Sequence, residues 1–344
     1  MAASDPHEQA PRKGAARLRD VAEAAGVDTS IASRILSGDS GLTVRPDTRR
    51  RVLEAAARLA YRPNTAARAL KTRKTMAIGM IVPELTNVAY ATIATGADER
   101  ASRAGYALLV ATGAVRDRLD AIDGRIDGLL VGIATSETVR MGDLGGALPT
   151  VLVNRHELLG LPSVTVDDEA GCALGTEHLL SLGHRHIGHV AGPQNSDTGR
   201  RRLAGYVRAL RGAGIQPAPD WMVEASYDEA GGELAASRLL RSSPRPTALF
   251  VANIRAAIGA LAAARRLGLA VPDDVSLVGF HDAPVAMYLD PELTTVKMPL
   301  REMGSAAVES LLAILEGREV DDVRIQTPPE LVVRASTAPP RAPR

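Results

Sequence analysis

The stretch LRDVAEAAGVDTSIASRIL, residues 18–36, decides how the amino-terminal part of the chain folds. Apolar side chains recur in it at helical spacing, at Leu18, Val21, Ala22 and Ala25 and then at Ile31, Ile35 and Leu36. Gly26 ends the first helix, and Asp28 can cap a second helix that starts after a short turn. A third helix begins at Pro46 and ends shortly before Pro63, because proline disfavours helix in the residue before it. This pattern predicts a small all-α domain whose first two helices form a helix-turn-helix.

From Met76 onward, short apolar runs alternate with amphipathic segments. The runs are AIGMIV, YALLVAT, DGLLVGI, PTVLVN and PSVTV in a first block and HIGHVAG, TALFVAN and VSLVGF in a second. Such continuously apolar runs are typical of parallel strands that helices cover on both faces. We therefore expect an α/β body made of two doubly wound parallel-sheet lobes, with a cleft between them, split near residue 166. The run TTVKMP, followed by the helical MGSAAVESLLAILEG, indicates that the chain crosses back to the first lobe.

These patterns give a predicted domain organisation for the 344 residues. The predicted parts are a disordered arm (1–16), the helix-turn-helix domain (17–62), a hinge helix with linker (63–75), a first lobe (76–166 and 298–325), a second lobe (167–297 and 326–337) and a disordered tail (338–344). The Pro-rich end has no leucine heptads, so no coiled coil for building higher oligomers is expected.

Charge is distributed unevenly along the chain, which has a net charge of +1. Residues 1–75 hold 15 Lys and Arg against 8 Asp and Glu, a net of +7, whereas the remainder holds 26 against 32, a net of −6. This asymmetry indicates nucleic acid as a partner of the first segment. No apolar stretch approaches the roughly 18 residues of a membrane span, and the start is polar, so we expect a cytoplasmic protein without a membrane partner. The single cysteine, Cys172, is interpreted as a core residue.

The helix-turn-helix sequence closely resembles that of the lactose and galactose repressor (LacI/GalR) family of transcriptional regulators. The segment PDTRRRVLEAAARLAYRPNTAARALKTRKTMAIGMIVPELTN continues the resemblance, as do GHRHIGHVAG, RRRLAGY, TALFVAN, VPDDVSLVGF and LTTVKMPLREMG. The resemblance covers nearly the whole chain. It implies a sequence-specific repressor, with carbohydrate use as the regulated process, whose lobes are of periplasmic-binding-protein type and bind a small-molecule effector. It implies neither an enzyme nor a cofactor.

The resemblance also implies which residues contact DNA. On the two helices and the predicted hinge helix these are Arg19, Thr29, Ser30, Ser33, Arg34, Asn64, Ala67, Arg68 and Leu70. Arg34 matches an arginine whose guanidinium can bond a guanine bidentately, and Leu70 matches a leucine that wedges into the minor groove. The hinge segment is too short to be stable alone, so it should fold on DNA. Two hinge helices must meet at the operator centre, which implies a homodimer and a pseudo-palindromic site.

The effector is expected in the cleft at the carboxyl ends of the strands. By resemblance, the binding residues are Asn87, Tyr90, Asn154, Arg155, Thr198, Arg202, Tyr227, Asn253 and His281. A sugar is the leading expectation, and a nucleoside, nucleobase or other metabolite stays open.

Several positions depart from the family pattern. Asp28 stands where serine is usual, and its charge should repel phosphate. Asn154 and His281 stand where Asp is common, Met298 where a polar residue is common, and Ile31 and Ile254 also differ. The pocket is thus less acidic than a typical sugar site. The segment VATGAVRDRLDAIDGRIDGLLV is too short for the long helix of the family, which predicts a shortened helix or a local rearrangement.

An enzyme and a transport binding protein are the two alternative classes of function. For an enzyme, the histidines of GHRHIGH suggest a metal cluster, yet alternate strand residues face opposite ways and no acidic ligand accompanies them. The carboxylates Asp167 and Asp168 are expected to face solvent, and GxSxG, GxxxxGK[ST] and GxGxxG motifs are absent. A transport binding protein would be favoured by a signal peptide, which the sequence does not show. A DNA-binding regulator remains the prediction.

Overall fold

The computed structural model describes residues 16–37, 41–61, 74–122, 124–133, 148–156 and 160–341. The chain divides into two compact units, residues 1–75 and residues 76–344. The predicted hinge residues Asn64, Ala67, Arg68 and Leu70 lie outside the described residues.

The described residues of the first unit, 16–37, 41–61 and 74–75, contain the three helices that the sequence predicts for the helix-turn-helix domain: α1 (Leu18–Ala25), α2 (Thr29–Leu36) and α3 (Pro46–Arg58). Gly26 ends α1 in the left-handed conformation, with φ 65° and ψ 43°, which glycine adopts without steric cost. Asp28 caps α2, and Pro46 occupies the first turn of α3. The helices share one small core, to which each contributes: Val21, Ala22, Ala25, Ala32, Ile35, Val52, Ala55 and Ala56 are buried.

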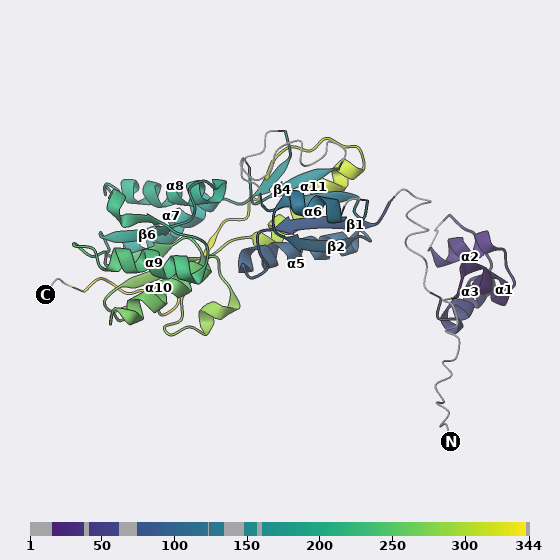
Figure 1. Ribbon diagram of the computed structural model, residues 1–344, viewed down its shortest axis with the longest axis horizontal. Helices are drawn as coiled ribbons and strands as arrows, with labels where there is room; N and C mark the ends of the chain where they lie inside the picture. Colours follow the sequence, from purple (N-terminus) through teal and green to yellow (C-terminus); the bar gives the residue numbers. More distant parts are fainter. Residues whose placement is uncertain are drawn as a thin grey trace, which may run out of the picture. The chain divides into compact units, whose positions relative to one another are not determined.

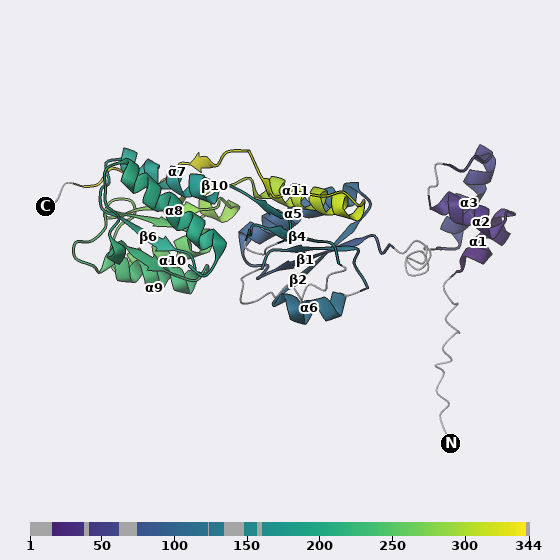
Figure 2. The same cartoon turned by 90° about the horizontal axis from the view of Figure 1, so that it is seen from above.

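The first sheet of the second unit has six parallel strands in the order β11-β5-β4-β3-β1-β2. Their bounds are β1 (Ala77–Val82), β2 (Ala107–Thr112), β3 (Gly128–Val131), β4 (Thr150–Val153), β5 (Ser163–Thr165) and β11 (Val323–Arg324). Helices α5 (Val88–Arg103) and α11 (Leu300–Leu315) cover one face, and α6 (Val115–Ile122) lies on the other (Figure 2). Gly96 of α5 and Gly304 of α11 allow close approach, because a Cβ on either would overlap the backbone of the facing helix.

The second sheet also has six strands, in the order β12-β10-β9-β8-β6-β7. They are β6 (Ile187–Ala191), β7 (Met222–Glu224), β8 (Ala248–Val251), β9 (Ser276–Phe280), β10 (Thr294–Lys297) and β12 (Glu330–Val332), which alone runs antiparallel. Helices α7 (Asp168–Ser181) and α8 (Asp197–Gly212) cover one face, and α9 (Glu229–Leu240) and α10 (Ile254–Arg266) cover the other (Figures 1 and 2). The second lobe also contains the short 3₁₀ helices η2 (Pro219–Trp221) and η3 (Pro284–Met287).

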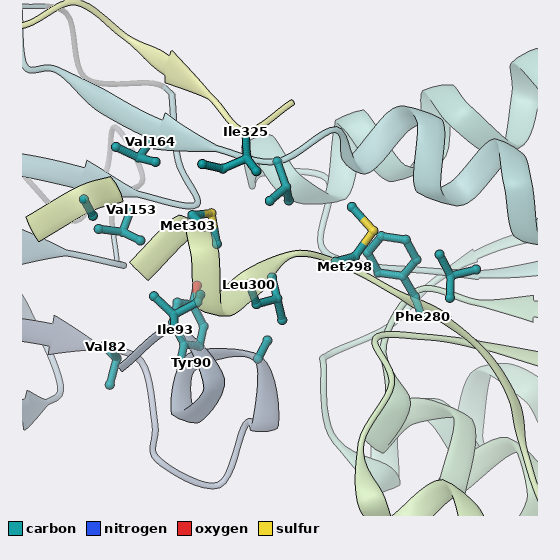
Figure 3. Packing of buried hydrophobic residues seen from close by; sticks show 14 of the residues in the cluster. Val82, Tyr90, Ile93, Val153, Val164, Phe280, Met298, Leu300, Met303 and Ile325 are labelled. Carbon is teal, nitrogen blue, oxygen red and sulfur yellow. The ribbon is translucent and has the colours of Figure 1, made fainter. Parts of the chain in front are cut away.

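The chain passes between the two sheets three times, after β5, after β10 and after β11. The second crossing carries Met298 and Leu300, which are 6% and 4% exposed and belong to a hydrophobic cluster that draws on both sheets. Figure 3 shows the Met298 side chain beside the Phe280 ring, with Leu300 and Met303 continuing toward Tyr90 and Ile93. The polar residue common at position 298 in the family is thus replaced by a side chain that joins the cores of both lobes.

Two expectations from the sequence concern the segment between β2 and β3 and the tail that begins at residue 338. The segment between β2 and β3 holds a shortened helix, α6, of 8 residues. The prediction of a disordered tail from residue 338 is wrong for residues 338–341. The Ala338 N–H donates to Ser276 Oγ at 3.0 Å, and Arg341 forms ion pairs with Asp273 and Asp274 at 2.8 and 3.2 Å. These contacts fix the segment against the second lobe.

Candidate functional site

The exposed face of α2 carries short polar side chains. Thr29, Ser30 and Arg34 are exposed and Ser33 is half-buried, whereas Ala32 and Ile35 turn inward to the core. Arg19 is exposed on α1. The predicted base-reading residues therefore form an accessible surface on the second helix of the helix-turn-helix, which is the geometry that major-groove reading requires.

Asp28 begins this surface. Its carboxylate accepts a hydrogen bond from the Ser30 backbone N–H at 2.7 Å, and hydrogen bonds from the Ser30 side chain and backbone lower the pKa of the Asp28 carboxyl. The residue is an N-cap, as the sequence predicts, and a stably ionised one.

The second unit holds a cavity of about 150 Å³ at the carboxyl ends of the strands of both sheets. All nine residues that the sequence analysis named for the effector line it, together with Pro83, Glu84 and Ala89: Asn87, Tyr90, Asn154, Arg155, Thr198, Arg202, Tyr227, Asn253 and His281. A volume of this size holds roughly ten water molecules. It is thus on the scale of one sugar ring.

Two of these side chains also cap helices. Asn87 Oδ1 accepts from the Ala89 N–H at 3.1 Å at the start of α5, and Asn253 Oδ1 accepts from the Arg255 N–H at 2.8 Å at the start of α10. Because these bonds fix the amide orientation, each Nδ2 group is left to donate elsewhere.

Arg202 is held by a complete set of partners. Its Nε donates to Asp168 Oδ1 at 2.8 Å, its Nη1 to the Ala252 carbonyl at 2.9 Å and its Nη2 to His281 Nε2 at 3.2 Å. The guanidinium also lies over the rings of Tyr227 and Phe280, 5.3 and 4.6 Å from their centroids. With 3% exposure, Arg202 is part of the wall of the cavity and of its structural support.

The expectation that Asp168 faces solvent is wrong. Its side chain is fully buried, and Arg201 Nη2 donates to Asp168 Oδ2 at 2.6 Å while Arg202 binds the other oxygen. Burial opposes ionisation, but the two arginines outweigh it and lower the pKa of Asp168 to about 2. Asp167, half-buried, caps α7 by accepting from the Ala170 N–H at 2.8 Å.

His281 presents one ring nitrogen without a partner. Burial, helped by the charge of Arg202, lowers the pKa of His281 to about 3, so the ring is neutral. Because arginine only donates, Nε2 accepts from Arg202, which places the proton on Nδ1. That Nδ1–H is buried and has no partner among the described residues. His281 and Asn154 both adopt positive φ, 71° and 62°, where their strands end, a strained geometry that is typical of functional sites.

Arg155 links the two lobes across the cavity. Its Nη1 donates to Thr198 Oγ1 at 3.1 Å, and its Nη2 lies 3.4 Å from Tyr90 Oη, which itself donates to the Gly132 carbonyl at 3.0 Å. Figure 3 places the Tyr90 ring beside Ile93 in the first lobe. Arg155 and Tyr90 thus form part of the cavity wall that the first lobe contributes.

Glu84 also lines the cavity and was not predicted from the sequence. This carboxylate lies between the lobes, and Arg255 Nη1 donates to Glu84 Oε1 at 2.5 Å while Arg255 Nη2 donates to Glu229 at 2.7 Å. The position of Glu84, shortly after β1 in the same loop as Asn87, was the available signal, since residues that follow parallel strands meet at one sheet edge.

The three histidines of GHRHIGH have different surroundings. His184 and His186 precede β6; His184 is buried and bonds Thr247 Oγ1 and the Ala338 carbonyl at 2.8 and 2.9 Å. His189 is buried between Tyr206 and Phe250, with ring centroids 4.7 and 5.4 Å away. In the part of the chain that the structure describes, no group of three or more His, Cys, Asp or Glu side chains is placed to hold a metal ion. No described helix is long and apolar enough to span a membrane.

A helix-turn-helix domain joined to a two-lobed domain with a buried polar cavity defines a ligand-controlled DNA-binding regulator. Residues 17–64 match the family of bacterial regulatory proteins, lacI family, and residues 176–337 match the periplasmic binding protein-like domain. The chain belongs to the LacI family, which confirms the fold class and the resemblance. It is a transcriptional regulator with DNA-binding and effector-binding domains, and not an enzyme.

Relatives match over almost their full length. The HTH-type transcriptional regulator reg1 of Streptomyces lividans is 36% identical over 340 residues, covering 94% of this chain and 96% of that protein. The ribose operon repressor of Haemophilus influenzae is 33% identical over 328 residues, covering 93% and 98%. The crystal structure of the lac repressor dimer bound to operator and the anti-inducer ONPF is 29% identical, with a TM-score of 0.80 and coverage of 94% and 99%.

Proposed function

We propose that the protein is a cytoplasmic repressor of carbohydrate-use genes that binds a pseudo-palindromic operator as a homodimer, under the control of a sugar in the cavity. The observation that carries the effector part is the set of buried polar atoms without partners at the cavity: Asn154 Oδ1, Tyr227 Oη and His281 Nδ1. Buried polar groups in folded proteins are almost always satisfied, so a ligand with complementary polar groups would complete them. The ribose operon repressor among the relatives supports a sugar.

For DNA, the proposed contacts are those that the resemblance implies. Thr29, Ser30, Ser33 and Arg34 would read base edges with α2, and Arg19 would bind the backbone. Asn64, Ala67, Arg68 and Leu70 would form the hinge contacts in the minor groove. The exposure of Thr29, Ser30 and Arg34 supports the first group.

A dimer is supported by apolar side chains left exposed on the second unit. Val285, Met287 and Tyr288, in and beside η3, are 37%, 49% and 82% exposed. On the edge strand β2, Leu109 and Val110 are 42% and 38% exposed. Clustered exposed apolar groups mark association surfaces, and the related lac repressor structure is a dimer on its operator.

The proposed mechanism is a shift between two arrangements of the lobes. Arg155 bonds Thr198 across the cavity, and Glu84 pairs with Arg255 from the opposite lobe. An effector that binds one arrangement more tightly shifts the population toward it, and the shift alters how two hinge helices meet on DNA.

The experiment is selection of duplexes from a random library with the full chain, followed by a screen of sugars and nucleosides for altered operator affinity. We expect a palindromic consensus, a steep loss of affinity with salt, at about −0.9 log units per neutralised phosphate, and a response to a sugar. A palindromic consensus together with a response to nucleosides alone would mean that the effector is a nucleoside and not a sugar. Absence of any consensus would contradict the proposal.

A further inference from the structure

Arg155 is a buried cation that lacks an acidic partner. It is 8% exposed, and its guanidinium contacts neutral oxygens only: Thr198 Oγ1 at 3.1 Å, Tyr90 Oη at 3.4 Å and the Gly132 carbonyl at 3.5 Å. No carboxylate of the described residues forms an ion pair with it. Charges that a protein buries are normally paired, because removing an ion from water is costly.

The other charged side chains that line the cavity already have ion-pair partners, and Arg255 is shared between Glu84 and Glu229. Arg202 is paired with Asp168, and Glu84 with Arg255. Asp168 cannot serve Arg155 as well, because Arg201 and Arg202 occupy both of its oxygens. Among the described lining residues, the charge of Arg155 is therefore the one that a ligand would have to neutralise.

Helix ends add positive potential at the same place. The residues Asn87, Thr198 and Asn253 line the cavity at the amino-terminal ends of α5, α8 and α10, helices of 16, 16 and 13 residues. The amino-terminal end of a helix carries a partial positive charge and favours anions.

Most of the hydrogen-bonding groups turned to the cavity can donate: of the three buried, unpartnered atoms on the described lining residues, Asn154 Oδ1 accepts, Tyr227 Oη can donate or accept, and His281 Nδ1 donates. The unpartnered Nδ1 of His281 is a donor, since Nε2 accepts from Arg202. The Nδ2 groups of Asn87 and Asn253 are donors too, because their Oδ1 atoms cap helices. Neutral sugar hydroxyls need acceptors as well as donors, whereas phosphate and carboxylate oxygens only accept.

We propose that the effector is a metabolite of about sugar size that carries a phosphate or carboxylate group, and that Arg155 binds this anionic group. A guanidinium can bind either group with two parallel hydrogen bonds. The inference rests on the proposed function and narrows its effector class from sugars in general to anionic ones.

The test measures binding to the full chain by calorimetry, with glucose, glucose 6-phosphate, gluconate and inorganic sulfate as probes. We expect at least one anionic probe to bind tenfold or more tightly than glucose. The variant Arg155→Gln should abolish this preference, and Arg155→Lys should retain part of it. The matched control is Arg208→Gln, which removes an exposed arginine outside the cavity and should change nothing.

A second variant keeps the inference falsifiable if Arg155→Gln folds poorly. His281→Asp replaces a donor by a carboxylate, so it should weaken the binding of anionic probes at least tenfold more than it changes the binding of glucose. Equal affinity for neutral and anionic probes, loss of both alike in Arg155→Gln, or absence of binding by every anionic probe would overturn the inference.

Failure of this inference is distinguishable from failure of the proposed function. If glucose binds as tightly as the anions and shifts operator affinity, the inference alone fails. If a probe binds and operator affinity does not change, the proposed control of DNA binding fails, whatever the charge of the probe.

Discussion

At the residue scale, Asp28 illustrates a conflict between folding and function. Its carboxylate caps α2 through the Ser30 N–H, yet it places a negative charge at the helix end that we propose approaches the DNA backbone. Serine would cap equally well without the charge, because its hydroxyl is a comparable hydrogen-bond acceptor.

We therefore predict that Asp28→Ser tightens DNA binding at low salt about two- to fivefold, the scale of one exposed charge interaction. The gain should shrink as salt rises, since exposed charges are screened. Fluorescence anisotropy with a labelled duplex measures both effects. Asp28→Ala serves as the control for the cap and should lower the melting temperature of the helix-turn-helix domain. Unchanged or weaker binding by Asp28→Ser would show that the carboxylate does not face phosphate.

Among the buried histidines, His189 and His281 have the most strongly lowered pKa values and make stability depend on pH. Burial lowers the pKa of His189 to about 4 and that of His281 to about 3, from an ordinary value of 6.5. Below pH 6.5 the unfolded chain therefore binds protons that the folded chain excludes, and stability falls as pH falls toward these lower values. From pH 7 to pH 5 each histidine should cost about 2 kcal/mol of unfolding free energy. Asp168 does not contribute to this change between pH 7 and pH 5. The stability that its lowered pKa provides is lost only as pH falls below the ordinary pKa of 3.8.

The prediction is checked by denaturant unfolding of His189→Gln at pH 7 and pH 5. The variant should lose about half of the pH dependence that the two histidines produce, and the exposed His186→Gln should keep all of it. A pH dependence that survives intact in His189→Gln would contradict the assignment.

The cavity was predictable residue by residue only through resemblance. The nine named side chains lie in loops that follow strands or in the first half of the next helix, and they line one cavity. Asp168 was not predictable as buried, because its partners Arg201 and Arg202 lie about one helix and one strand further along the chain, and nothing local indicates that ion pairing. The donor role of His281 likewise depends on a contact with Arg202 that only the folded chain creates.

At the element scale, α2 leaves the side chains that are predicted to read DNA exposed, because its apolar side chains pack into the core. Ala32 and Ile35 pack inward, which leaves Arg34 exposed next to them. Helical periodicity in the sequence determines this division, so it was predictable.

Arg34→Ala should relax base preference at one base pair in each half-site, at a cost of about 1 to 3 kcal/mol for the preferred base, the usual value for a bidentate contact. Repeating the library selection with the variant measures this directly. Uniform weakening on all sequences would identify Arg34 as a phosphate contact instead.

The elements that the sequence did not reveal are short edge strands. The strands β7, β11 and β12 have 3, 2 and 3 residues, and their side chains are partly or wholly exposed except for Val223. Strands that short carry no apolar run, so their pairing is decided by the neighbouring strand. The apolar runs of the sequence correspond to β1 to β6, β8 and β9, whereas β10, a buried strand with the sequence TTVK, was predicted only as part of a crossing between the lobes.

At the scale of the whole molecule, DNA binding is expected to depend on dimer formation. Tyr288 is 82% exposed beside Met287, which is 49% exposed, so the proposed interface includes an aromatic anchor.

Tyr288→Asp should convert the dimer to a monomer at micromolar concentration and lower operator affinity at least tenfold. Analytical ultracentrifugation and anisotropy measure the two effects. Val333→Asp, at a 58% exposed site outside this patch, is the control and should remain dimeric. A Tyr288→Asp protein that stays dimeric would place the interface elsewhere.

We propose above all that occupancy of the cavity controls the affinity of the helix-turn-helix domain for its operator. The most direct measurement is a titration of the selected operator with the full chain, without and with a saturating effector. We expect operator affinity to change roughly 5- to 150-fold, the usual range of coupling between two sites, and effector affinity to change by the same factor when operator is present. Equal operator affinity in the two titrations, with calorimetry showing the effector bound, would contradict it.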